Sequence, residues 1–219
     1  MLWRHDMRRL KSSLALSELR DIRKMTLLQQ AKTLGGVGSL LIVLFVVPTV
    51  GWLLALVGLI MVLVAVRYLS IELGDRTIFN NMMISVGAAI AGVVIAGVYI
   101  ASAVLAYFGI HGGFDFTPTP GTIPTDMIAL ILSVVAGLVV VWLALVVSAF
   151  FLRRSFGVIG ARLKVGYFKT SALLYLIGAA TAIVLIGFVI LFVAEIMQLV
   201  AFFSIPDQLA PSGTPPTTA

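Results

Sequence analysis

Long apolar runs separated by short polar segments are the feature that most constrains this chain. A helix needs about 20 apolar residues to cross a hydrocarbon core of about 30 Å. Five runs reach or approach that length, at about 30–47, 52–69, 84–108, 127–152 and 171–203. In lipid, every backbone N–H and C=O group must be bonded internally, which a helix achieves within one segment. The sequence therefore predicts an all-α, polytopic membrane protein with five transmembrane helices.

Composition agrees with this fold class. Hydrophobic residues make up 61% of the 219 residues and charged residues 11%, whereas charged residues average about 25% in soluble domains. The absence of cysteine excludes disulfides and thiolate chemistry. No His-Glu-x-x-His motif, phosphate-binding glycine loop or Gly-x-Ser-x-Gly motif occurs. We therefore expect no cofactor and no enzymatic activity.

The basic residues indicate how the chain is oriented. All 15 lie before or at the start of the first run, from the end of the second run to the third, or between the fourth and fifth. The other loops, and the tail after Ser204, contain none. Because Lys and Arg are enriched on the cytoplasmic side, we expect the N-terminus inside and the C-terminus outside. The net charge of +6 then reflects this bias, and no nucleic-acid partner is expected.

The first run is the weakest. Its uninterrupted apolar part, Val37 to Val47, is too short to span alone and must recruit the residues before it, with Lys32 reaching to the interface. A hairpin that re-enters on its own side is the alternative.

The chain divides into three parts. Residues 1–24 form a basic extension, either an interfacial helix or a mis-assigned start, with Met25 as the true one. Residues 25–205 form the five-span membrane domain. Residues 206–219 are rich in proline and threonine and are expected to be disordered.

Glu195 is the ionisable residue that falls inside an apolar run, and Gln198 shares its helical face. Such a group is costly in lipid and so indicates function, here a proton or cation site. The alternative is that the last run shifts or tilts and leaves Glu195 among the outer headgroups.

The stretch from Tyr68 to Met83 carries a second group of polar residues, namely Glu72, Asp75, Arg76 and Asn80. A turn followed by a helix explains them, with Asp75 as the N-cap. The same side chains would suit a contact at the inner face.

Weaker candidates lie in three other places. His111, Asp115 and Asp126 lie in the second outer loop, but their spacing matches no metal motif. The basic loop 153–169 suits lipid headgroups or a simple juxtamembrane anchor. Small residues four apart, such as Gly87 and Ala91, suit helix packing within the chain or a homo-oligomer.

Two stretches resemble a known family. They are "MTLLQQAKTLGGVGSLLIVLFVVPTVGWLLALVGLIMVLVAVRYLSIELGDRTIFNNMMISV" and "YFKTSALLYLIGAATAIVLIGFVILFVAEIMQLVAFFSIP". Both are similar to the archaeal integral membrane proteins of domain of unknown function family 996. The resemblance implies a multi-pass protein of an archaeal plasma membrane, supplies no catalytic residues, and places residues 1–24 before the usual family start.

Two roles are consistent with these observations. The near absence of polar groups within the runs favours a structural or accessory component, which packs with itself or with a larger membrane complex in the lipid bilayer. The alternative is a transporter or channel for a small solute or ion that uses Glu195.

Overall fold

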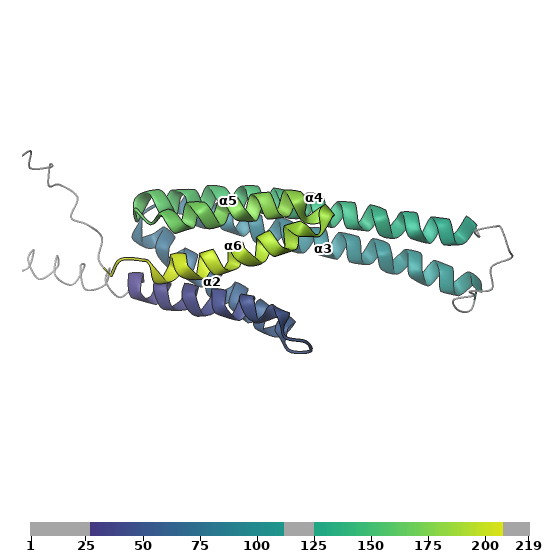
Figure 1. The fold of residues 1–219 in the computed structure, drawn as a ribbon, viewed down its shortest axis with the longest axis horizontal. Helices are drawn as coiled ribbons and strands as arrows, with labels where there is room; N and C mark the ends of the chain where they lie inside the picture. Colours follow the sequence, from purple (N-terminus) through teal and green to yellow (C-terminus); the bar gives the residue numbers. More distant parts are fainter. Residues whose placement is uncertain (1–26, 112–124, 208–219) are drawn as a thin grey trace, which may run out of the picture.

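The computed structural model describes residues 27–111 and 125–207, and this part of the chain is helical apart from its turns (Figure 1). The prediction of an all-α fold is confirmed. Six helices are long and apolar enough to cross a membrane. They are the first helix (Leu27–Val46), whose last turn is η1 (Leu44–Val46), α2 (Gly51–Glu72), α3 (Arg76–His111), α4 (Thr125–Arg162), α5 (Gly166–Thr181), which continues into η2 (Ala182–Val184), and α6 (Ile186–Phe203).

The expected single span over 171–203 is wrong, because α5 and α6 fold back on each other there. The chain reverses at Leu185, which has a left-handed φ of 60°. Close packing follows the reversal: a Cβ on Gly187 would lie 2.2 Å from the Ala182 nitrogen. The turn residues are apolar and include no proline. Hydropathy alone therefore predicts one uninterrupted helix across them.

This reversal also changes the expected position of the C-terminal end. Asp207 forms a salt bridge with Lys32 near the start of the first helix, with 3.1 Å between Lys32 Nζ and Asp207 Oδ1. Phe202 packs over Gly35, where a Cβ would lie 2.1 Å from its ring. The expected location of the C-terminal end opposite the N-terminal end is therefore not supported for residues up to Asp207. The α2–α3 and α4–α5 turns lie at this same end, so the basic residues in the described part of the chain share one side (Figure 1).

The helices differ strongly in length. α3 has 36 residues and α4 has 38, about 54 and 57 Å at 1.5 Å per residue. α5 and α6 have 16 and 18 residues, about 24 and 27 Å. α3 and α4 therefore project as a pair well beyond the other helices (Figure 1).

The core lies in the half of the bundle that carries the charged turns. Phe156, Phe168 and Phe202, from α4, α5 and α6, are fully buried. Their rings meet edge to face with centroids 5.2 to 6.3 Å apart, a favoured aromatic geometry. Ser155 bonds the Ile78 carbonyl at 2.8 Å and so ties α4 to α3. This packing fixes the helices around the cavity described next.

Candidate functional site

A cavity of about 300 Å³ lies between the helices above the aromatic core. Most of its lining is aliphatic, from the first helix and α2 to α6. Five polar side chains also line it: Ser85, Ser148, Tyr175, Glu195 and Gln198. These five side chains come from α3, α4, α5 and α6, so four helices place polar groups around one space. This arrangement is common in ligand sites.

Glu195 is the acidic side chain in this cavity. It lies midway along α6, and its Oε2 is buried with no hydrogen-bond partner among the described residues. The Tyr175 hydroxyl is close enough to interact with the same carboxylate. The carboxylate therefore faces the interior of the bundle, whereas its depth relative to the outer headgroups stays a prediction.

A hydrogen-bonded chain runs along one wall of the cavity. The Tyr175 hydroxyl donates to Gln198 Oε1 at 3.1 Å, and Gln198 Nε2 donates to Ser39 Oγ at 2.9 Å. All three side chains are buried. The chain joins α5, α6 and the first helix, and it leaves the Glu195 carboxylate as the group with free acceptor capacity.

Ser85 and Ser148 line the cavity from α3 and α4. Their hydroxyls lie 3.0 Å apart and link α3 to α4. Each hydroxyl can both donate and accept, so the pair can turn toward a polar guest in the cavity.

A second, more apolar cavity of about 600 Å³ adjoins the first. Its lining comes from the first helix, α2 and α6 and includes Phe45, Phe188 and Phe192. Ile42, Leu191 and Glu195 line both cavities. Glu195 therefore lies where the cavity that holds the five polar side chains meets an apolar groove lined by exposed residues such as Phe45 and Phe188.

Asp75 has the role that the sequence predicts, since it caps the start of α3. Its Oδ1 accepts bonds from the Thr77 N–H at 3.0 Å and the Thr77 hydroxyl at 2.6 Å. The Thr77 hydroxyl, and then the Thr77 N–H, stabilise the carboxylate and lower the pKa of Asp75. Gly74, with φ of 65°, ends α2 in the left-handed conformation that glycine tolerates best. Residues of the turn itself therefore account for its conformation.

The six candidates from the sequence separate into two groups. Glu195 and Gln198 line the cavity together. Glu72, Asp75, Arg76 and Asn80 lie at or next to the α2–α3 turn and do not line it. Arg76 and Asn80 are exposed. The sequence analysis missed Ser39, Ser85, Ser148 and Tyr175. In the sequence, each of them is distinguished only by a single hydroxyl group within an apolar run.

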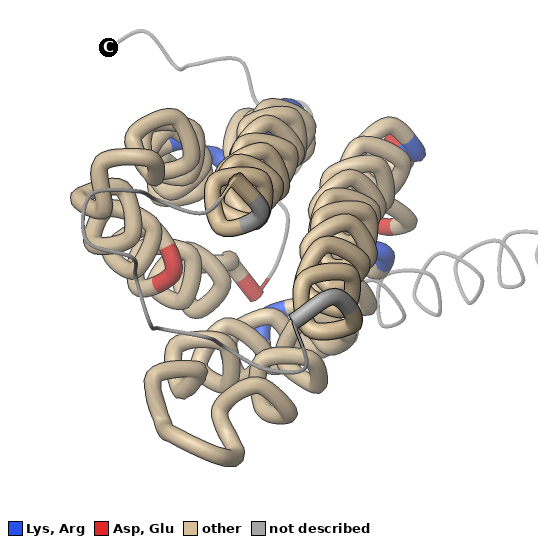
Figure 2. The backbone as a smooth tube through the Cα atoms, turned by 90° about the vertical axis from the view of Figure 1, so that its right-hand side faces the viewer, with Lys and Arg blue, Asp and Glu red and all other residues tan. Residues whose placement is uncertain are grey.

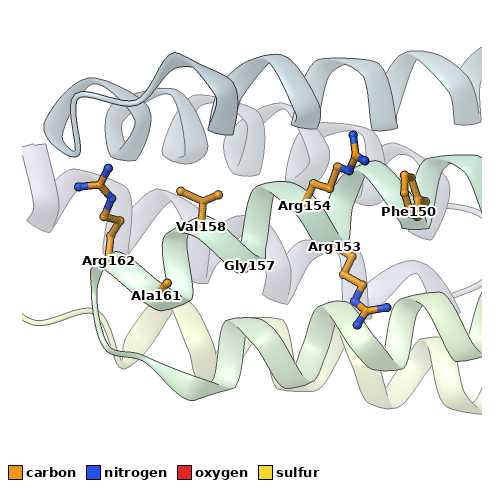
Figure 3. A pocket seen from close by; sticks show the side chains of 7 residues that line it. All are labelled: Phe150, Arg153, Arg154, Gly157, Val158, Ala161 and Arg162. Carbon is orange, nitrogen blue, oxygen red and sulfur yellow. The ribbon is translucent and has the colours of Figure 1, made fainter.

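A basic groove of about 420 Å³ lies on the surface of α4 (Figure 3). Arg153, Arg154 and Arg162 line it, with no acidic residue among the lining side chains. The Arg154 guanidinium lies 4.7 Å from the centre of the Phe150 ring, a cation–π arrangement. Arg153 and Arg154 point in opposite directions in this view. The groove fits anionic headgroups better than a neutral ligand.

The remaining candidates have mixed outcomes. Asp115 and the side chains of His111 and Asp126 lie outside the described residues. Elsewhere, within 27–111 and 125–207, no group of three or more His, Asp or Glu side chains could hold a metal ion. Of the small residues, Gly92 packs against Ala144, whereas a Cβ on Gly87 or Gly97 would meet nothing within 4 Å.

Residues 54–196 match the family described as a protein of unknown function, DUF996. The chain belongs to this family. An uncharacterized protein from Methanocaldococcus jannaschii is 30% identical over 183 residues, which is 83% of this chain and 95% of that relative. No solved structure matches the chain. The expected DUF996 membership is confirmed, and the match includes Glu195.

Proposed function

We propose that this protein is a membrane carrier that binds a small organic cation at Glu195 within the bundle. The observation that carries the proposal is the buried Glu195 Oε2, which lines both cavities and has no hydrogen-bond partner among the described residues. An ionisable group among apolar helices is costly and commonly marks a transport or proton pathway. Its free acceptor capacity suits a hydrogen-bonding cation or a proton.

The lining of the cavity favours an organic cation over a divalent metal ion. Ca²⁺ takes about 6–8 oxygen ligands and Mg²⁺ about 6 in strict geometry. The cavity offers one carboxylate, and its other side-chain oxygens are the neutral ones of Ser85, Ser148, Tyr175 and Gln198. The aliphatic walls instead suit the alkyl part of an amine or guanidine, whose charged head would pair with Glu195.

The volume agrees with a small ligand. The cavity of about 300 Å³ is at the lower end of the range of about 300–1,000 Å³ for ligand sites. The adjoining apolar cavity meets it at Ile42, Leu191 and Glu195. An alkyl chain can occupy that second space while the head contacts the carboxylate.

Butylguanidinium tests this proposal, because a guanidinium stays charged at neutral pH and so does not cross bilayers as a neutral form. Binding to the protein in nanodiscs, and uptake into proteoliposomes, are measured against butylurea, a neutral analogue of similar shape. We expect Glu195→Gln to weaken butylguanidinium binding at least tenfold and to abolish uptake. Glu72→Gln, outside the cavity, serves as the control. Equal binding of the two probes by the wild-type protein would refute the proposal.

An accessory role in a membrane assembly is the second candidate function. It is supported by the open faces at Gly87 and Gly97 and by the exposed side chains of Arg76 and Asn80 at the charged end. Native-membrane purification tests it. Arg76→Ala or Asn80→Ala should then remove a partner that co-purifies with the wild-type protein, while the helical content is unchanged.

Location and orientation complete the proposal. The long apolar helices and the archaeal relative support a plasma membrane location. The bias of Lys and Arg toward one end supports placing that end in the cytoplasm. In this orientation Lys32 and Asp207 both lie on the inner side.

A further inference from the structure

α3 and α4 reach much further along the bundle axis than the other helices. Trp142 Nε1 donates to the Ala180 carbonyl at 3.2 Å, and the α5–α6 hairpin reverses at Leu185, about 7 Å further along the axis. Residues 125–141 of α4 extend about 25 Å beyond Trp142, and so about 18 Å beyond the hairpin tip, at 1.5 Å per residue. The outer half of α3 accompanies them, as the packing of Ile100 on Gly137 shows.

These projecting halves are apolar. Residues 77–111 of α3 and 127–152 of α4 contain no Asp, Glu, Lys or Arg. In Figure 2, which looks from the projecting ends, the charged segments lie behind the tan helix ends. Large side chains such as Val98, Leu105 and Leu132 are exposed there. If the short helices spanned the hydrocarbon core, these halves would stand in water.

The arginines on α4 mark the inner boundary of the apolar part. From Leu152 back to Met127 the helix runs about 38 Å, enough for a core of about 30 Å. Arg153, by contrast, is only about 16 Å along the axis from Trp142. With the distance from Ala180 to the reversal at Leu185 added, the α5–α6 hairpin reaches about 24 Å from the level of Arg153, short of the full hydrocarbon core of about 30 Å.

Both hairpin tips are apolar where a water-facing loop would be polar. Residues 182–188 contain no polar side chain, and Leu185 is 75% exposed. The tip between the first helix and α2 is apolar apart from Thr49, with Val46 69% exposed. Each tip has a 3-10 turn, η2 or η1, followed by a residue with positive φ, Leu185 or Thr49.

The tips also bond backbone groups internally. Val47 N–H donates to the Leu44 carbonyl, and Gly51 N–H donates to the Val47 carbonyl. In the other hairpin, Leu185 N–H donates to Ala182 and Phe188 N–H to Leu185. Pro48, in the first tip, has no N–H to satisfy. Internal bonding of this kind is what a turn at membrane depth requires.

We propose that only α3 and α4 cross the bilayer among the described helices, and that the other four form two re-entrant hairpins. Their tips, residues 44–51 and 182–187, end within the hydrocarbon and are covered by acyl chains of the outer leaflet. Glu195 then lies in the inner half of the membrane. This inference stands independently of the proposed carrier function, since it rests on lengths, charges and tips rather than on the cavity.

The natural absence of cysteine makes a direct test available. Single cysteines replace Val50 and Leu185 at the tips, Thr125 at the projecting end and Thr170 at the charged end, all exposed positions. Vesicles of both orientations are treated with a membrane-impermeant maleimide. We expect Thr125→Cys to react from one side, Thr170→Cys from the other, and the tip variants only after detergent is added. Reaction of a tip variant from the Thr125 side would overturn the inference.

A second measurement distinguishes lipid from a protein that covers the tips. Trp3→Phe and Trp142→Phe leave Trp52, an exposed tip-flanking residue, as the only tryptophan. Lipids brominated near the bilayer centre should quench Trp52 more than lipids brominated near the headgroups. Absence of quenching by either lipid would contradict cover by acyl chains. Ile183→Cys provides a second α5–α6 tip variant if Leu185→Cys does not fold.

Discussion

Tyr175 and Gln198 are joined across the α5–α6 hairpin by a buried hydrogen bond of 3.1 Å, from the tyrosine hydroxyl to Gln198 Oε1. The Gln198 side-chain amide then reaches Ser39 on the first helix. The same tyrosine lies beside Glu195. The Tyr175–Gln198 pair thus joins the two helices of the hairpin and also supplies two of the polar side chains that line the cavity.

Tyr175→Phe should destabilise the protein, because Gln198 Oε1 would lose its described donor in a buried place. Leaving a buried acceptor unsatisfied costs about 1–3 kcal/mol. Tyr167→Phe, an exposed position on the same helix, is the matched control and should change little. Thermal unfolding in detergent measures both. Equal melting temperatures for the two variants would contradict a structural role for the hydroxyl.

Gly187→Ala should destabilise the α5–α6 hairpin, since its Cβ would lie 2.2 Å from the Ala182 nitrogen and 2.3 Å from the Gly178 carbonyl oxygen. Both are backbone atoms, which cannot move aside as the end of a flexible side chain can. Gly157→Ala, where a Cβ meets nothing within 4 Å, is the control and should be neutral or slightly stabilising in a helix. Unfolding temperatures and protease resistance compare them. A tolerated Gly187→Ala would mean that the tip is looser than described.

The pH dependence of the α2–α3 turn follows from Asp75, whose pKa the Thr77 bonds lower. A carboxylate with a lowered folded pKa stabilises the fold above its unfolded pKa of about 3.9. That contribution is lost as the pH falls through the folded pKa. The stability difference between wild type and Asp75→Ala should thus be full at pH 7 and shrink below about pH 4. A difference that does not change with pH would contradict charge-assisted capping.

The basic groove on α4 predicts a preference for anionic lipid. Arg154→Ala should reduce the number of anionic phospholipids retained in native mass spectra, since each juxtamembrane cation contributes about 1 kcal/mol. Arg76→Ala, outside the groove, is the comparison. Equal lipid retention by both variants would place the preference elsewhere.

The sequence predicted those features whose signal is local. Helices followed from long apolar runs, and Asp75 as an N-cap followed from its place before a helix. Glu195 and Gln198 followed from being polar within an apolar run. The partners of Gln198 did not, because Tyr175 and Ser39 lie 23 and 159 positions away along the chain and only tertiary packing brings them together.

The break between α5 and α6 was missed for a different reason. Turns are usually marked by Gly, Pro, Asn or Asp, but η2 and Leu185 are apolar. The hairpin tip is marked by a close approach of backbones at Gly178 and Gly187, which is a property of the folded chain and not of its hydropathy. The re-entrant alternative was raised for the first run because Val37 to Val47 is short. The last run is long enough to conceal the same arrangement.

The measurement that tests the central claim most directly is infrared difference spectroscopy of the carboxyl group of Glu195 when butylguanidinium is added to the protein in lipid. A change in the carboxyl or carboxylate bands is predicted for the wild-type protein and for Glu72→Gln, and its absence is predicted for Glu195→Gln. A band change that persists in Glu195→Gln, or no change in the wild-type protein at saturating probe, would contradict the assignment of Glu195 as the binding group.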